Sequence, residues 1–175
     1  MTVSTHRSDL LRFALLFSAL YLAFGAASPF LPAFFSSRGL APEQVGLALS
    51  LATTIRLLSG PFAGRLADRL HALRIVLAIC TAMAGLIALG LVPAQGFLLL
   101  LVVSLLHAAM LAPTTVLADA LALGAASPPG VARPRFEYGW VRGAGSAAFI
   151  VGSLVSGQAI ARSVARQSWS CRQHF

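Results

Sequence analysis

Three ionisable side chains lie inside otherwise apolar runs of this sequence, where they could bind or move charge. Arg56 follows LSLATTI, His107 follows LLLLVVSLL, and Asp119 follows LAPTTVLA. A guanidinium binds a carboxylate through two parallel hydrogen bonds, and an imidazole gains or loses its proton near neutral pH. A carboxyl group carries a proton or pairs with an arginine. The arginine suits recognition of an anionic or hydroxyl-rich small molecule, and the histidine and aspartate could transfer a proton.

Each of the three also has a structural interpretation. Arg56 lies about 9 Å from the end of its apolar run, so its side chain either reaches the membrane surface or faces a cavity. For His107 we expect a hydrogen bond to a neighbouring helix in preference to a proton or substrate role. For Asp119 we expect pairing in preference to proton transport, and the candidate partners are Arg142, Arg65 and Arg69.

The composition places these residues in a membrane protein. Of 175 residues, 58% are apolar and only 10% are charged, and the mean hydropathy is +0.83. Soluble domains carry about 25% charged residues. The net charge of +8 comes from arginines at the ends of apolar runs and not from a basic face, so we expect no nucleic-acid partner. Cys80 and Cys171 suggest neither a disulfide nor a metal site, and we expect no cofactor.

Five apolar runs are long enough to cross a hydrocarbon core of about 30 Å. The sequence therefore predicts an all-α membrane protein with a cytoplasmic N-terminus over residues 1–12, transmembrane helices over 13–161 and a polar tail over 162–175. Residues 36–43, 93–96 and 125–136 are predicted turns or loops. The predicted spans are Phe13–Phe35, Val45–Phe62, Ile75–Val92, Phe97–Leu123 and Trp140–Ala161.

The distribution of arginines predicts the orientation. With the N-terminus inside, the outer loops before the tail hold only Arg38, which fits the excess of arginine expected in cytoplasmic loops. The tail then lies outside with three arginines, against this rule, so we interpret residues 162–175 as a truncated or frameshifted ending. We expect a plasma (inner) membrane location in the lipid bilayer. The arginines assigned to the inside are Arg7, Arg12, Arg65, Arg69, Arg74, Arg133, Arg135 and Arg142.

Small residues predict where helices approach one another. In the second span, Gly46, Ser50, Thr53 and Gly60 share a stripe that we expect to face protein, because small residues let helix backbones approach closely in lipid. In the fifth span, the spacing of Gly139 and Gly143 likewise predicts close packing. A charged hinge, Gly60–Arg74, separates the second and third spans, and its carboxylate and guanidinium groups could pair and separate as helices move.

The hinge carries a family signature. Gly64, Asp68 and Arg69 match the loop G-x-x-x-D-R-x-G-R-R of the major facilitator superfamily, which this chain resembles, and Arg74 supplies a further charge. The segment Leu70–Ala72 departs from the signature, which has a glycine and a basic residue there. The resemblance implies that the four matching or charged residues form a conformational clasp between transporter halves.

Other stretches resemble the phenylpropionate-permease-like branch, which groups with sugar and proton symporters. The segment Ser37–Gly46 resembles its first outer loop, and Asp119–Leu123 matches the DALAL that ends its fourth helix. The fifth helix of that branch carries Y-G-x-x-R-x-x-G-S, matched here from Tyr138 by Gly139, Arg142, Gly145 and Ser146. The likeness runs from Phe13 to Gly157.

This resemblance implies part of the N-terminal half of a twelve-helix transporter that works by alternating access, with a proton as the coupling ion and an aromatic acid or sugar as the substrate. Arg56, His107 and Asp119 are then the candidates for substrate binding or coupling. The missing C-terminal half is an expected partner. No catalytic constellation is present, so we expect no enzyme. The alternatives are a small membrane interaction or assembly protein that transports nothing, and an oligomeric pore.

Overall fold

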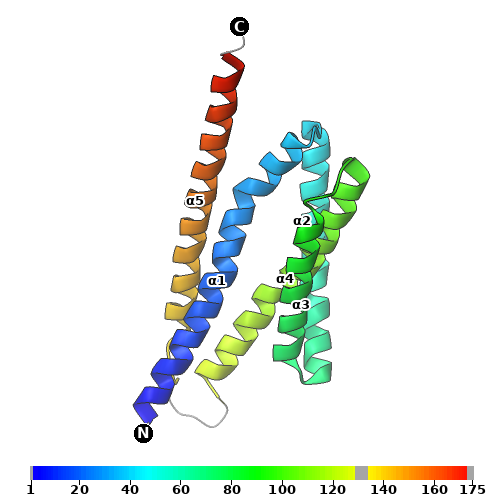
Figure 1. Ribbon diagram of the computed structural model, residues 1–175. Helices are drawn as coiled ribbons and strands as arrows, with labels where there is room; N and C mark the ends of the chain where they lie inside the picture. Colours follow the sequence, from blue (N-terminus) through cyan, green and yellow to red (C-terminus); the bar gives the residue numbers. More distant parts are fainter. Residues whose placement is uncertain (1, 129–133, 173–175) are drawn as a thin grey trace. The chain divides into compact units, whose positions relative to one another are not determined.

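A computed structural model describes residues 2–128 and 134–172, with side chains for 7–128 and 134–162. Its elements are five α-helices, each containing a stretch that is long and apolar enough to cross a membrane. This confirms the predicted fold class. The helices, shown in Figure 1, are α1 (Thr2–Ser37), α2 (Pro42–Leu70), α3 (Leu73–Gly90), α4 (Phe97–Ala126) and α5 (Tyr138–Arg172).

Both turns that the sequence analysis assigned to the outer side are present in the structure. Gly39, between α1 and α2, and Gly96, just before α4, have φ angles of 78° and 77°, a left-handed region that glycine enters without steric cost. Pro42 begins α2 as predicted, where a missing N–H removes no helical hydrogen bond. The Ala41 N–H instead donates to Oε1 of Gln44 at 3.1 Å.

The charged hinge is not a loop, and this corrects the prediction. Helix α2 continues through Pro61 to Leu70, so Gly64, Asp68 and Arg69 lie in its last turns and Arg74 in the first turn of α3. The segment 62–70 is rich in alanine, leucine and arginine, which favour helix, and it contains no second proline; its one glycine, Gly64, is tolerated within the helix. The connection is reduced to two residues, of which His71 closes the helix with a φ of 49°.

Two further helices are longer than predicted. Helix α4 runs without interruption through His107 and Pro113 as far as Ala126. Helix α5 passes the predicted end at Ala161 and continues to Arg172, because residues 158–172 contain neither proline nor glycine. The predicted loop 125–136 lies partly outside the described residues.

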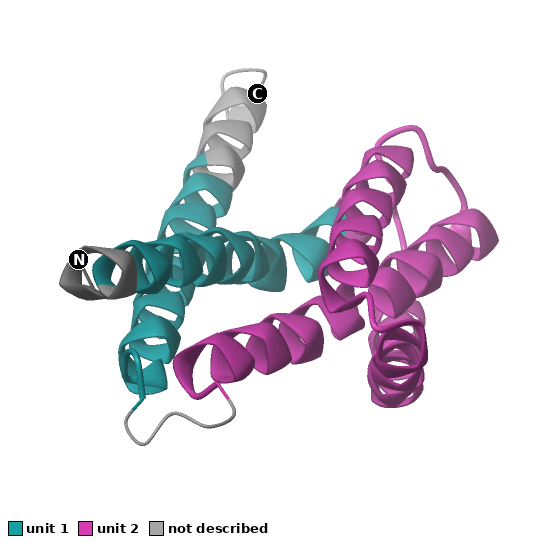
Figure 2. Ribbon diagram, turned by 90° about the horizontal axis from the view of Figure 1, so that it is seen from below, with its two compact units in different colours: residues 1–34, 134–175 teal, residues 35–133 magenta. Residues whose placement is uncertain are grey.

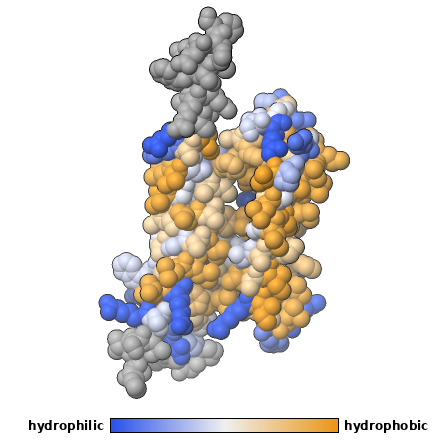
Figure 3. All heavy atoms as spheres, viewed as in Figure 1, coloured by the Kyte–Doolittle hydropathy of each residue, from blue (hydrophilic) through white to orange (hydrophobic). Residues whose placement is uncertain are grey.

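The chain divides into two compact units, coloured separately in Figure 2. The first comprises residues 1–34 and 134–175, and Phe17 and Val141 are fully buried within it. The second comprises residues 35–133, in which α4 packs against both α2 and α3. Hydrophobic side chains cover the middle of the helices and hydrophilic ones gather near their ends, as Figure 3 shows. This distribution suits a bilayer.

Small residues allow close packing in the core of the second unit, beside large buried side chains such as Leu100 and Leu117. Ala67 on α2 and Ala118 and Ala122 on α4 are wholly buried, and a Cβ on Gly60 would lie 3.7 Å from Cγ2 of Val116. Of the predicted α2 stripe, Gly60 alone is buried, whereas Gly46, Ser50 and Thr53 are exposed. The prediction that this stripe faces protein therefore holds at Gly60 and fails at the other three within the described structure.

Candidate functional site

Helices α1 and α5 of the first unit run parallel and cross closely. Contacts advance in the same direction along both helices, since Phe17 meets Tyr138 near one end and Ala26 meets Ser156 further on. Parallel directions are what two odd-numbered spans require if the chain crosses the membrane five times. The pairing therefore agrees with the predicted topology.

Two glycines bring the backbones together at the crossing. A Cβ on Gly25 would overlap the carbonyl of Phe149, and a Cβ on Gly152 would overlap the carbonyl of Leu22. Two hydroxyls then reach across: Ser153 Oγ donates to the Gly25 carbonyl at 3.1 Å. Ser156 Oγ donates to the Ala26 carbonyl at 2.8 Å. Close approach and interhelical hydrogen bonds stabilise helix pairs in lipid.

The predicted packing glycines of the fifth span are not the ones used. Nothing lies within 4 Å of a Cβ placed on Gly139 or Gly143, whereas Gly145 would bring its Cβ to 3.0 Å from the ring of Tyr21. The prediction failed because it considered spacing on one helix, while close packing also depends on the face that meets the partner. The motif glycine Gly145 does lie at the interface.

The motif arginine of α5 is held by an aromatic residue of α1. The guanidinium of Arg142 lies over the Tyr21 ring, 4.8 Å from its centroid, and also donates a hydrogen bond to the Tyr21 hydroxyl. Ser146 Oγ donates to the Arg142 carbonyl at 3.2 Å. A cation held against an aromatic face has a restricted orientation. The motif therefore forms a fixed, exposed positive group beside the α1–α5 crossing.

The second unit places two of the three predicted ionisable residues on neighbouring helices. Arg56 lies exposed on α2, and His107 lies half-buried on α4, which packs against α2. A guanidinium and an imidazole together offer several N–H donors, a set that suits a carboxylate or hydroxyl group. The pair is a candidate for small-anion recognition.

Asp119 does not belong to that pair. It lies twelve residues beyond His107 on α4, which is about 18 Å along a continuous helix, and its side chain is half-buried. Its expected pairing with an arginine stays a prediction. If Asp119 takes part in proton coupling, it does so at a different depth along α4 from His107.

The four signature residues of the hinge do not all face one site. Asp68 and Arg74 line a hollow of about 740 Å³ at the α2–α3 turn, together with His71 and Leu121. No ion pair joins Asp68 to Arg74 in the described part of the chain. Arg69 does not line the hollow. Because Asp68 and Arg74 line the same hollow, these two residues could act together in the predicted clasp.

A further residue, unassigned by the sequence analysis, connects the two outer turns. Arg38 donates from Nη1 to the Ala94 carbonyl at 2.8 Å and from Nη2 to the Val92 carbonyl at 2.5 Å. These carbonyls follow the C-terminal end of α3, where a positive charge is favourable. The only signal in the sequence was that Arg38 is the single arginine assigned to an outer loop.

Among the residues that the structure describes, no group of three histidine, cysteine or acidic side chains could hold a metal ion. What the fold and these polar groups define is a multi-pass α-helical membrane protein with ionisable residues along its spanning helices. Comparison with known families refines this: the chain belongs to the MFS_1 like family, whose model matches residues 10–169.

A curated relative agrees with the family assignment. The chain is 28% identical over 139 residues to the uncharacterized transporter YwbF of Bacillus subtilis (strain 168). The match covers 79% of this chain but 34% of the relative, so the chain spans about a third of that protein. No solved structure gave a significant match. The five helices are consistent with part of a major facilitator fold.

Proposed function

We propose that the protein is a secondary active transporter of a small organic substrate, such as an aromatic acid or a sugar. It works by alternating access with a proton as the coupling ion, as part of a complete protein containing a second transporter half. The observation that carries this proposal is the family match over residues 10–169, joined to a relative named as a transporter. The chain's own contribution is two packed helix units with ionisable residues along their spanning helices.

In this proposal, Arg56 and His107 bind the polar end of the substrate. The support is that they lie on two helices that pack together, at positions where an unused charge would be costly in a membrane. Asp119 acts separately, either in proton coupling or as a partner of an arginine. Asp68 and Arg74 contribute the clasp from their shared hollow. The N-terminus is cytoplasmic in a plasma or inner membrane, on the arginine distribution.

The test is uptake by the complete gene product, with labelled aromatic acids and sugars at imposed pH gradients. Replacing Arg56 with glutamine should abolish saturable uptake, whereas Arg56→Lys should retain a weakened part because it keeps the charge but loses the planar donors. Arg12→Gln is the matched control. Arg12 is exposed, and its carboxylate partner is Asp9 on the same helix, at 4.0 Å. Normal uptake by Arg56→Gln would contradict the assignment.

One alternative is a small membrane protein that binds partner helices and transports nothing. The exposed Gly46, Ser50 and Thr53 of α2 favour it, because small polar residues suit helix contacts more than lipid contacts. Absence of uptake for every substrate, together with stable capture of a partner membrane protein, would support this function over transport.

A further inference from the structure

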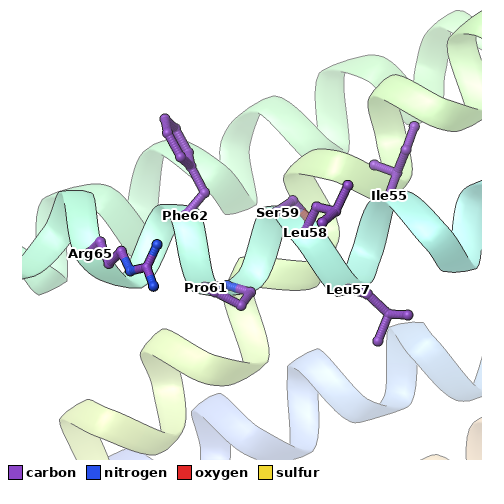
Figure 4. Close-up of a pocket in the computed structure, with 7 residues that line it drawn as sticks. All are labelled: Ile55, Leu57, Leu58, Ser59, Pro61, Phe62 and Arg65. Atoms are coloured by element: carbon purple, nitrogen blue, oxygen red, sulfur yellow. The ribbon is translucent and has the colours of Figure 1, made fainter.

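We propose that the cytoplasmic end of α2 binds an anionic phospholipid in a surface groove that ends at Arg65. The groove has a volume of about 520 Å³, and its lining includes Leu58, Pro61, Phe62 and Arg65. Figure 4 shows these side chains on α2, with Arg65 extending back along the helix toward Pro61. The groove therefore has an apolar floor and one cationic end.

The helical period supports this assignment by separating two sets of residues. Leu58, Phe62, Arg65 and Arg69 are spaced by four, three and four residues, so they share one face of α2. Asp68 lies outside that set. On this face the two arginines directly continue a row of apolar side chains. The carboxylate of Asp68 flanks the row, three residues after Arg65, and no ion pair joins it to either arginine among the described residues.

The apolar part of the groove is open to its surroundings. Leu57, Leu58 and Phe62 are 72%, 70% and 71% exposed. In a membrane, such side chains meet acyl chains. Pro61 adds a polar feature, because it has no N–H to donate to the carbonyl of Leu57, which is thereby left for another donor. A lipid hydroxyl or bound water can fill that place.

The depth of the arginines suits a headgroup. By helical rise, Arg65 lies about 4.5 Å beyond Phe62 and Arg69 about 10 Å beyond it. The interfacial layer on each side of the hydrocarbon core is about 5 to 7 Å thick. With the orientation proposed above, Arg65 lies within this layer of the cytoplasmic leaflet, which carries the anionic lipids. The backbone of Arg69 lies beyond the layer, and its long side chain points back toward it because helical side chains point toward the N-terminus. Charge and depth therefore select a phospholipid phosphate as the occupant.

Retention of defined lipids by the purified full chain tests this proposal independently of transport. The chain is exchanged into micelles with phosphatidylglycerol or phosphatidylcholine, and bound lipid is counted by native mass spectrometry. We expect phosphatidylglycerol to be preferred. Arg65→Gln should weaken its binding about five-fold and the Arg65→Gln, Arg69→Gln pair about 25-fold, the factors for about 1 kcal/mol per arginine.

Arg74→Gln is the matched control, since it removes the same charge from the neighbouring helix and lies outside the groove. Equal losses for Arg74→Gln and Arg65→Gln would overturn the site in favour of general charge attraction. A circular-dichroism melt of each variant separates lost binding from lost folding, and Arg65→Lys, which keeps the charge, should retain binding if the chain is folded.

A photo-crosslinker introduced at position 58 identifies the occupant directly. In vesicles containing phosphatidylglycerol, it should capture phospholipid, and competition by added phosphatidylglycerol should reduce the yield. Capture of a second copy of the chain, or of another protein, in place of phospholipid would overturn the proposal.

Discussion

Replacing Gly152 with alanine should separate α1 from α5. The added Cβ would overlap the Leu22 carbonyl oxygen and lie 3.1 Å from the amide nitrogen of Ala26. Both neighbours are backbone atoms, so relief requires movement of a whole helix. That movement breaks the two serine hydrogen bonds across the pair, each of which contributes about 0.6 kcal/mol. Overpacking itself costs about 1 to 3 kcal/mol.

Alanine also has a favourable effect, because it replaces glycine in a helix and recovers up to about 1 kcal/mol. The net change at Gly152 is therefore a destabilisation of about 1 to 3 kcal/mol. Gly143→Ala on the same helix is the matched control, since nothing lies within 4 Å of a Cβ placed there. It should be neutral or stabilising, so the two substitutions have opposite signs.

The assay is unfolding of the purified chain in mild detergent with increasing dodecyl sulfate, followed by circular dichroism. Ser156→Ala measures one interhelical hydrogen bond alone and should cost about 0.6 kcal/mol. Equal midpoints for Gly152→Ala and Gly143→Ala would refute the close crossing. A loss at Gly143 with no loss at Gly152 would restore the packing originally predicted from spacing.

Substitutions at three further residues test the remaining contacts by the same unfolding assay. Arg38→Gln should lower the free energy of unfolding by about 1 to 3 kcal/mol because two carbonyls lose charged donors. An unchanged midpoint would contradict a stabilising role for the hydrogen bonds from Arg38 to the turn after α3. His71→Gly should stabilise by about 0.5 to 1 kcal/mol, because an L-residue at a φ of 49° is strained and glycine is not; destabilisation would show that the imidazole is needed. Tyr21→Phe keeps the ring beneath Arg142 and should cost less than Tyr21→Leu, and equal costs would exclude a cation–π contribution.

Local features of the fold were predictable because they depend on residues close together in the sequence. The spans follow from the lengths of the apolar runs, and the outer turns follow from Gly39 and Gly96, whose left-handed backbone glycine tolerates. The end of α2 was not predictable in this way. Pro61 and three arginines suggested a loop, yet a membrane helix tolerates proline and can extend beyond the core before it ends.

The partners within the candidate site depend on which helices are neighbours, and one sequence does not contain that information. The motif on α5 identified Arg142, but nothing in it identified Tyr21 as the residue beneath the guanidinium. Likewise, Arg56 and His107 were chosen separately for their chemistry. That they lie on neighbouring helices depends on the packing of α2 against α4, which buried alanines permit.

His71 connects the departure from the family signature with the local geometry. The signature G-x-x-x-D-R-x-G places a glycine seven residues after Gly64, and in this chain that position is His71. Its φ of 49° is a conformation that glycine adopts without strain, so the signature glycine has a backbone explanation. The same turn forms the hollow that holds Asp68 and Arg74. His71 therefore adds an imidazole to the lining of this hollow while leaving the helix boundary in place.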